Sequence, residues 1–514
     1  MSDDGNNSIH PKKIFFLLLY IHAFLLLFAL LIPEGGLRIS DTFTFKFVAL
    51  HNVFEKKNNQ PKDIKQIVSS VVLDTLTTEQ ATIEPTLADS NIRDTVAQPL
   101  IINSGTELTN FFEALSTCEQ DKSALSIAYY GDSQVEGDRF SDYLRNRLQK
   151  QFGGGGPGIV TPIDISNMRI TVQQAESKEW TKIACFGYPL GKLEGARFGM
   201  SGALYRYYNG YYVTSRVPKD STGVDSITKR TWVSSHSNPW LSFKKSRLSY
   251  ASVKKYSAAT LWYTANKETP VKIQRDGSSV VDTLYPASTG TRSWKVSDST
   301  GHIRITFLSP GADVIGLALD EPEGVHVDNF SMRGSSGTDF SRLNGAYLAE
   351  QHRLRGTKLL VLQFGVNVVP YVDDSTEVVF YERSFLQQLQ LLKRQLPEVS
   401  ILVVGTTDIS TKEGTAYVTY PYLEQIRDAQ KRAAQQANCA FWDAYAAMGG
   451  KNSMPSWVFN QPPLAAKDFT HLSSRGANVL AQLLHEALMN EYYKFKRKNR
   501  LKPTAHNVSE TLKN

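Results

Sequence analysis

Ser133 is the first residue whose position suggests chemistry. It lies in the segment Gly131-Asp132-Ser133, directly after the strand-forming run of residues 124–130. A helical pattern begins at residue 140, so backbone N–H groups are available near the hydroxyl. This position suits a nucleophile whose own N–H helps to hold an oxyanion. Taken alone, Gly-Asp-Ser is more often a plain turn, because all three residues favour turns.

A histidine that could activate this hydroxyl lies near the other end of the chain, in Asp468-Phe469-Thr470-His471. Histidine is the side chain whose pKa suits a general base at neutral pH, and a carboxylate is needed to orient its ring. A separation of three residues on a loop lets Asp468 reach one ring nitrogen while the other faces the serine. Alone, this segment is more often a loop ahead of a helix with a surface histidine.

Two further segments follow predicted strands. Gly365-Val366-Asn367 ends the buried run of residues 358–366, and Ser331-Met332-Arg333-Gly334 ends the run of residues 325–332. The Asn367 amide and the Gly334 N–H are both hydrogen-bond donors that could stabilise a developing negative charge. Each is weak by itself, because Asn and Gly after a strand are common loop residues.

The elements that must position these residues alternate between strand and helix. Besides the strands just named, residues 401–409 and 439–445 read as strands, and residues 140–152, 380–396, 422–438 and 473–493 read as amphipathic helices. Such alternation predicts a parallel sheet with helices on both faces. All four segments then lie at one rim, where ligands of open α/β sheets bind.

An interruption of this pattern spans residues 196–325. Its short alternating runs are separated by Gly, Ser and Asp turns, which predicts an inserted all-β module of the sandwich or jelly-roll kind. Its aromatic residues either fill a β core or stack on sugar rings. The glycine run GGGGPG at 153–158 lacks a following Lys-Ser/Thr pair, so we interpret it as a flexible active-site or connecting loop rather than a phosphate-binding loop.

The order Ser, Gly, Asn, then Asp-x-x-His resembles the SGNH hydrolases, also called GDSL-type esterases, over residues 124–195 and 326–493. The resemblance implies a flavodoxin-like three-layer α/β domain. It implies Ser133 as nucleophile, His471 as general base and Asp468 as its orienting carboxylate. It also implies an oxyanion hole made by Ser133, Gly334 and Asn367, with no metal and no cofactor.

Two features depart from the family pattern. The third block of the family is usually Gly-x-Asn-Asp, but Val368 replaces the last residue here. That residue does not donate to the oxyanion, so we expect activity to survive. The segment Phe198-Gly199-Met200-Ser201-Gly202 is also similar to the glycine block. We prefer Gly334, because it ends a strand next to the central strand, whereas Gly202 precedes the β insert.

The inserted β module further resembles that of exported peptidoglycan O-acetylesterases, whose insert looks like a carbohydrate-binding module. The resemblance implies a serine esterase outside the cytoplasm that removes O-acetyl groups from a cell-wall or other polysaccharide, with an acylated glycan as its substrate partner. Two alternatives stay open: a polysaccharide O-acetyltransferase that uses the same triad, and a non-catalytic glycan-binding protein on this fold.

The charge of the chain does not favour a nucleic-acid partner. The formal net charge is +7, but six basic residues gather near the C-terminus and leave the rest almost neutral. These are Lys494, Lys496, Arg497, Lys498, Arg500 and Lys502. The three cysteines, Cys118, Cys185 and Cys439, are too few and too scattered for a disulfide framework or a structural zinc site.

The N-terminal part of the chain suggests attachment to a membrane. Residues 14–33 carry no charge and are preceded by Lys12 and Lys13, so we expect a transmembrane anchor with a cytoplasmic N-terminus. A cleaved signal peptide is the alternative. The expected organisation is a cytoplasmic segment (1–13), an anchor (14–33), a stalk (34–120), the first part of the hydrolase domain (121–195), the β module (196–325), the second part of the hydrolase domain (326–493) and a basic tail (494–514).

Overall fold

The computed structural model describes residues 11–31, 37–40, 43–45, 62–71, 101–102, 105–164, 168–216, 228–275, 277–297 and 299–500. These residues divide between two units, residues 1–60 and residues 61–514. We describe each unit by itself. The parts of the expected N-terminus, stalk and basic tail that fall outside these ranges lie outside the described residues.

The first unit contains one helix and one small hairpin. Helix α1 spans Pro11–Leu31, and strands β1 (Leu37–Ser40) and β2 (Phe43–Phe45) pair in antiparallel fashion. Among the described ranges, none of the helices combines the length and the apolar character that a bilayer crossing requires. The prediction of a transmembrane helix is therefore wrong, and with it the cytoplasmic assignment of residues 1–13 loses its basis.

The physical reason lies in where α1 begins and ends. The helix includes Lys12 and Lys13 in its first turn and ends at Leu31, while the last two residues of the expected span lie outside the described residues. Its charge-free part, residues 14–31, is about 27 Å long at 1.5 Å per residue. The hydrocarbon core of a bilayer is about 30 Å thick.

The second unit is built on a five-stranded parallel sheet with the order β17-β3-β18-β19-β22. Every residue of β3, β19 and β22 is buried, which is why these strands read as continuous apolar runs rather than alternating ones. The strands are β3 (Leu125–Gly131), β17 (Val325–Ser331), β18 (Thr357–Gln363), β19 (Ser400–Val404) and β22 (Ala440–Trp442).

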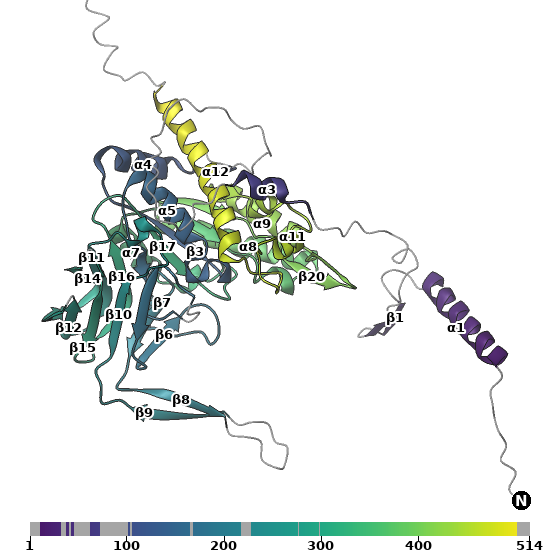
Figure 1. Cartoon of the computed structure of the whole chain (residues 1–514), viewed down its shortest axis with the longest axis horizontal. Helices are drawn as coiled ribbons and strands as arrows, with labels where there is room; N and C mark the ends of the chain where they lie inside the picture. The colour runs from purple at the N-terminus through teal and green to yellow at the C-terminus, as the bar shows by residue number, and fades with distance from the viewer. Residues whose placement is uncertain are drawn as a thin grey trace, which may run out of the picture. The chain divides into compact units, whose positions relative to one another are not determined.

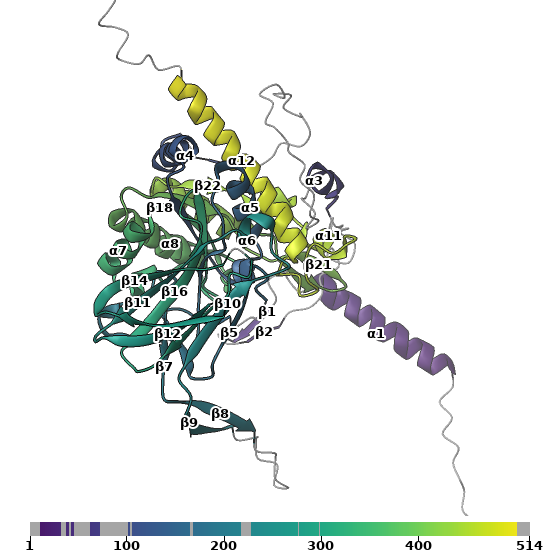
Figure 2. The same ribbon diagram turned by 60° about the vertical axis from the view of Figure 1, so that its left-hand side comes forward.

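Helices cover both faces of this sheet (Figures 1 and 2). One face carries α4 (Thr109–Asp121), α5 (Ser141–Phe152) and α12 (Ser474–Arg500), and the other carries α7 (Gly345–Arg355), α8 (Ser375–Gln395) and α9 (Leu423–Gln436). The predicted doubly covered α/β sheet is confirmed. Short elements complete this part: α3 (Lys65–Ser70), α10 (Ala444–Met448), α11 (Met454–Phe459), β20 (Ser410–Glu413) and β21 (Ala416–Thr419).

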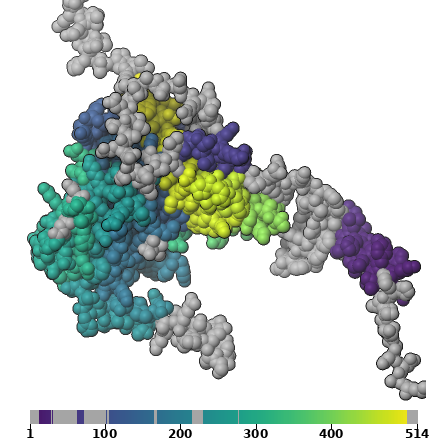
Figure 3. Space-filling view, viewed as in Figure 1, coloured from purple at the N-terminus to yellow at the C-terminus, as the bar shows by residue number. Residues whose placement is uncertain are grey.

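Two antiparallel sheets form the β part of the second unit, with the orders β13-β12-β15-β10-β5 and β14-β11-β16-β7-β6. Aromatic rings from the two sheets meet in the core, where Phe307 contacts Trp180 and Tyr207 at centroid distances of 5.2 and 4.9 Å. The sheets therefore pack face to face as a sandwich. The space-filling view shows their teal surface continuing into the rest of this unit (Figure 3).

The strands of the β part are β4 (Gly158–Val160), β5 (Val172–Glu176), β6 (Trp180–Ala184), β7 (Ala203–Tyr207), β10 (Trp240–Lys245), β11 (Ala258–Ala265), β12 (Thr269–Arg275), β13 (Ser278–Leu284), β14 (Ala287–Lys295), β15 (Ile303–Phe307) and β16 (Ala312–Asp320). A separate hairpin pairs β8 (Gly210–Arg216) with β9 (Thr228–Ser234), and the short helix α6 spans Ala251–Lys254.

The extent of the β part differs from the expected boundaries of 196 and 325. Strands β4, β5 and β6 precede residue 196, yet β4 pairs with β16, β5 with β10 and β6 with β7. These strands are three to five residues long, and β5 (VQQAE) is mostly polar, so they lack the alternating apolar signal. Helix α4 likewise lies within the expected stalk, but it buries Phe111, Phe112 and Leu115.

The glycine run at 153–158 packs closely against the backbone of the β part. Gly156 has a φ of +88°, and a Cβ there would lie 2.0 Å from the carbonyl oxygen of Leu319. Only glycine fits this crossing between α5 and β4. The glycine run is therefore a closely packed connection and not the flexible loop that the sequence predicted.

A buried ion-pair network ties the two parts together at the base of the parallel sheet. Arg355, at the end of α7, donates from two nitrogens to Asp328 on β17, each at 2.8 Å, and from a third to Asp320 on β16 at 2.6 Å. Asp328 also accepts hydrogen bonds from the Ser126 hydroxyl and the Ile159 N–H, both at 2.8 Å. The network thus connects β3, β4, β16, β17 and α7.

Candidate active site

The predicted serine, histidine and carboxylate lie together at the carboxyl rim of the parallel sheet. The Ser133 Oγ is 2.8 Å from the His471 Nε2, and the His471 Nδ1 is 2.8 Å from the Asp468 Oδ2. Both distances fall within hydrogen-bond reach. The three side chains are thus arranged in the order and at the spacing that nucleophilic catalysis requires.

Ser133 reaches this position because β3 ends abruptly. The strand stops at Gly131, and a 3₁₀ turn, η1 (Ser133–Asp138), begins two residues later. The Asp132 side chain caps the turn by accepting the Gln134 N–H at 2.9 Å. A Cβ at Gly131 would lie 2.7 Å from the Val135 side chain, so glycine is needed where the chain turns back.

Asp468 is held as an acceptor for the histidine. Its Oδ1 accepts the N–H groups of Thr470 and His471, both at 3.0 Å, and its Oδ2 faces the ring. Partial burial is the largest influence and acts to raise the pKa of Asp468, but the hydrogen bonds from His471 and Thr470 outweigh it and lower that pKa. Asp468 is therefore ionised at neutral pH and suited to orient an imidazolium.

The loop that carries Asp468 and His471 is anchored by an aromatic residue. Phe469 has a φ of +56° and stacks on Tyr417 of β21, with ring centroids 3.6 Å apart. A positive φ is unfavourable for an aromatic residue and persists only where its surroundings enforce it. The Phe469 carbonyl accepts the Ser410 N–H at 2.9 Å, which fixes the loop against β20.

Gln134 and Arg139, which follow Ser133 in the chain, hold the histidine loop from the other side, and the sequence analysis did not predict this role. The buried Gln134 donates to the Thr470 carbonyl at 2.6 Å and accepts the Leu472 N–H at 3.2 Å. It thus binds the backbone on both sides of His471. Arg139 donates to the carbonyls of Ser133 and Leu472 and so links the same two segments.

We expect Gln134→Met to lower kcat for ester hydrolysis about 10- to 100-fold while KM changes less than about threefold. The substitution keeps the side-chain volume but removes both hydrogen bonds, so the position of the His471 ring relative to Ser133 loosens. Gln435→Met, on the exposed surface of α9, is the matched control. Steady-state kinetics on a soluble ester separate the two constants. A rise in KM with unchanged kcat would contradict this role.

The predicted oxyanion donors follow strands that flank β3. Ser331 of β17 and Gln363 of β18 both pair with Gly131, so Gly334 and Asn367 begin the loops on either side of Ser133. Within the described residues the Gly334 N–H makes no hydrogen bond. The Asn367 Nδ2 donates one hydrogen to the Ser335 carbonyl at 3.1 Å, and the amide carries a second.

Gly202, the alternative glycine, lies in a different environment. Its N–H donates to the Gly199 carbonyl at 2.8 Å, and its own carbonyl accepts the Cys185 N–H at 3.0 Å. Its backbone is therefore committed to the turn that starts β7. Between the two glycines, only the one at 334 has its N–H unused within the described part of the chain.

The buried Asp132 has an unusual protonation state. Burial is the dominant influence and raises the pKa of Asp132 to about 7, although hydrogen bonds from the Gln134, Val366 and Gly365 N–H groups and the charge of Arg139 act in the opposite direction. The residue next to the nucleophile therefore retains its proton through mildly acidic pH.

We expect Asp132 to make the folded protein less stable as pH rises. Between about pH 4 and pH 7 the unfolded chain loses the Asp132 proton while the folded chain keeps it, so the free energy of unfolding falls by up to about 4 kcal/mol. Asp132→Asn cannot titrate and removes this contribution. Urea unfolding of both proteins at pH 5 and pH 8 measures it. An unchanged difference between the two proteins at the two pH values would contradict the assignment.

Comparisons with known proteins agree with this architecture. No family model matches the chain, and no curated protein matches it in sequence. Among solved structures, a peptidoglycan O-acetylesterase is similar at 21% identity with a TM-score of 0.58, covering 77% of this chain and 99% of that one. At this identity the likeness shows a shared fold. The chain shares the fold of that esterase over most of its length.

Two other solved structures are similar over smaller parts of the chain. An acetyl xylan esterase is 16% identical and covers 32% of this chain and 81% of its own, with a TM-score of 0.25. A lipase/acylhydrolase from Enterococcus faecalis is 17% identical and covers 35% of this chain and 80% of its own, with a TM-score of 0.24. These TM-scores are too low to carry an argument.

Proposed function

We propose that this chain is a serine esterase that removes O-acetyl groups from a cell-wall or other polysaccharide outside the cytoplasm. The observation that carries the proposal is the continuous path of hydrogen bonds from Ser133 through His471 to Asp468, with 2.8 Å at each step. The fold shared with a peptidoglycan O-acetylesterase makes acetylated glycans the first substrates to test.

In the proposed reaction the His471 Nε2 accepts the proton of Ser133 as its Oγ attacks the carbonyl carbon of the acetyl ester. The Nδ1–H donates to Asp468, which stabilises the positive ring. The tetrahedral intermediate then collapses, and the leaving sugar oxygen takes the proton from Nε2. Water repeats the same steps on the acetyl-serine, which releases acetate and restores the hydroxyl.

The charge that develops on the carbonyl oxygen needs donors that are already in place. We propose the N–H groups of Ser133 and Gly334 and the amide of Asn367 for this role. One such donor is worth about 2.7–4 kcal/mol of barrier. The unused Gly334 N–H supports its assignment, whereas the committed Gly202 N–H argues against the alternative.

The β sandwich is proposed to contact the glycan. Of the aromatic residues that could stack on sugars, Tyr205, Tyr207 and Trp262 are buried and belong to the core. Tyr208 and Tyr212 are exposed at 40% and 61%, and they are the ones available for stacking. Since Tyr208 follows β7 and Tyr212 lies on β8, we expect glycan contact to involve the β8–β9 hairpin and its junction with the sandwich in addition to the rim of the parallel sheet.

The test combines a covalent probe with substrate screening. A fluorophosphonate is expected to label the protein at Ser133, as located by peptide mass spectrometry. Acetate release is then measured on acetylated peptidoglycan and acetylated xylan. Acetylated acceptor sugar instead of acetate would indicate a transferase, and glycan binding without labelling or acetate release would indicate a non-catalytic binding protein. Either result would overturn the proposed hydrolase.

A further inference from the structure

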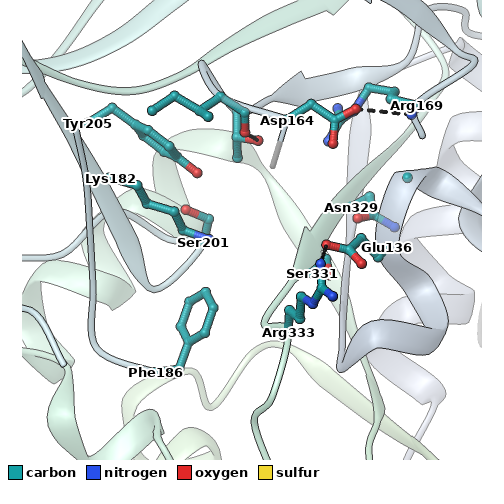
Figure 4. Close-up of a pocket in the computed structure, with 13 residues that line it drawn as sticks. Glu136, Asp164, Arg169, Lys182, Phe186, Ser201, Tyr205, Asn329, Ser331 and Arg333 are labelled. Carbon is teal, nitrogen blue, oxygen red and sulfur yellow. Dashed lines mark hydrogen bonds and ion pairs between the residues drawn. The ribbon is translucent and has the colours of Figure 1, made fainter. Parts of the chain in front are cut away.

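A hollow lies between η1 and the β sandwich (Figure 4). One wall is formed by Glu136 and Gly137, which follow Ser133 in η1, and by Arg333, which precedes Gly334. The opposite wall comes from the β part and carries Lys182 of β6 and Tyr205 of β7. A ligand in this hollow would therefore contact both parts while it lies close to the nucleophile.

Arg169 is a buried cation whose hydrogen bonding is incomplete. It lines the hollow, its side chain is only 7% exposed, and its Nε and Nη1 atoms have no hydrogen-bond partner. The nearest carboxylate oxygen to Nη1 belongs to Asp138 and lies 3.9 Å away, beyond hydrogen-bond range. A buried guanidinium normally has its N–H groups paired, so this side chain indicates a missing acceptor.

Lys182 is another cation that lines the hollow. Within the described residues its Nζ makes no ion pair and no hydrogen bond, and its one recorded contact is with the Phe186 ring at 4.7 Å from the centroid. Burial lowers the pKa of Lys182, although the charge of Glu136 acts in the opposite direction. An anion bound in the hollow would offset the free-energy cost of burying the charged form of Lys182.

The two carboxylates that line the hollow are already engaged. Glu136 forms an ion pair with Arg333 at 3.5 Å, and Asp164 accepts the backbone N–H of Arg169 at 3.0 Å (Figure 4). Of the three cations that line it, Arg333 pairs with Glu136 and Arg169 has Asp138 at 3.9 Å. Lys182 is thus the lining cation that has no carboxylate within ion-pair distance in the described part of the chain. The hydroxyls of Ser201 and Ser331 add neutral partners suited to sugar hydroxyls.

We infer that this hollow binds a carboxylate group of an acidic glycan, with Lys182 and Arg169 as its charged partners, while an O-acetyl group of the same glycan reaches Ser133. The inference rests on the proposed function, because it names the substrate class of that site. It predicts a preference for glycans that carry uronic or other carboxylated sugars over neutral glycans of the same backbone.

The first experiment measures binding without catalysis. The full chain carrying Ser133→Ala is titrated calorimetrically with polygalacturonate and with the same polymer after its carboxyl groups have been reduced to alcohols. We expect the acidic polymer to bind at least about tenfold more tightly than the reduced one. We also expect the difference to shrink at high salt. Equal affinities for the two polymers would overturn the inference.

Variants then assign the preference to the hollow. Lys182→Met is expected to reduce the preference about tenfold, and Lys182→Arg, which keeps the charge, to retain it within about threefold. Lys295→Met is the matched control, because Lys295 is exposed on β14, at the opposite edge of the same sheet from β6. A preference that survives Lys182→Met, or that falls equally with Lys295→Met, would place the anion elsewhere and overturn the assignment.

A kinetic measurement separates this inference from the proposed function. Acetate release by the protein with Ser133 intact is compared on the two polymers, each acetylated to the same degree. We expect the acidic polymer to have the higher kcat/KM, mainly through a lower KM. Release at equal kcat/KM from both polymers would refute the inference and leave the esterase standing. Tight binding of the acidic polymer without any release would refute the esterase and leave the binding site standing.

Discussion

Ser133→Ala is expected to lower kcat for acetate release by at least about 10⁴-fold, because the variant has no oxygen that can form the acyl intermediate. The removed hydroxyl is the one that faces the His471 Nε2 at 2.8 Å. What remains is the stabilisation from the oxyanion donors and from substrate binding, which in serine hydrolases still exceeds the uncatalysed reaction. The fold should be unaffected, since the substitution removes only one oxygen atom from a small side chain.

Acetate release and fluorophosphonate labelling are the two measurements for this variant. Ser375→Ala is the control, because Ser375 is an exposed serine at the start of α8. The control should keep both the activity and the label, whereas Ser133→Ala should lose both. Retention of more than about a tenth of the wild-type kcat by Ser133→Ala would exclude Ser133 as the nucleophile.

Arg355→Met is expected to destabilise the fold by about 3–5 kcal/mol, the usual cost of removing one partner from a buried ion pair. The substitution leaves Asp328 without the charge that offsets its burial. Burial is the strongest influence on Asp328 and favours its neutral form, but Arg355 and the hydrogen bonds around it lower the pKa of this carboxyl. Asp320 loses its partner at the same time.

Urea unfolding measures this loss, and an exposed ion pair provides the matched control. Arg432 of α9 contacts Glu382 of α8 at 2.5 Å, but its side chain is 49% exposed. Water compensates the loss of such a pair, so Arg432→Met should cost less than about 1 kcal/mol. Equal losses for the two variants would show that burial of the Arg355 network contributes nothing to stability.

The sequence predicted the parallel sheet well, because its strands are buried on both faces and therefore appear as uninterrupted apolar runs. It also predicted that Ser133, Asp468 and His471 meet at one rim, since each lies beside a predicted strand or helix end, and the structure places them within hydrogen-bond distance. The role of Gln134 was invisible for a physical reason. Its partners, Thr470 and Leu472, are more than 300 positions away, and no local pattern reports a contact made by folding.

The predicted and observed elements also differ where the hydrophobic pattern was weak or was misinterpreted. Helix α4 carries Phe111, Phe112, Leu115 and Cys118 at helical spacing, a signal that the expectation of a stalk passed over. Strand β5 gave no such signal, because three of its five residues are polar or charged in the segment VQQAE. The apolar run after Lys13 was taken for a membrane span, although no helix in the described part of the chain combines the length and the apolar character that a crossing requires.

The pairing of β4 with β16, and of β5 and β6 with their later partners, determines where the chain can be cut. Deletion of residues 196–325 would remove the partners of these three short strands. Their edges would then be unpaired, and unpaired strand edges promote aggregation. All strands of the two sheets lie between β4 and β16, so the sandwich is one contiguous stretch of chain that is longer than the expected module at its N-terminal end. Truncation or swapping experiments should instead take junctions before β4 and after β16.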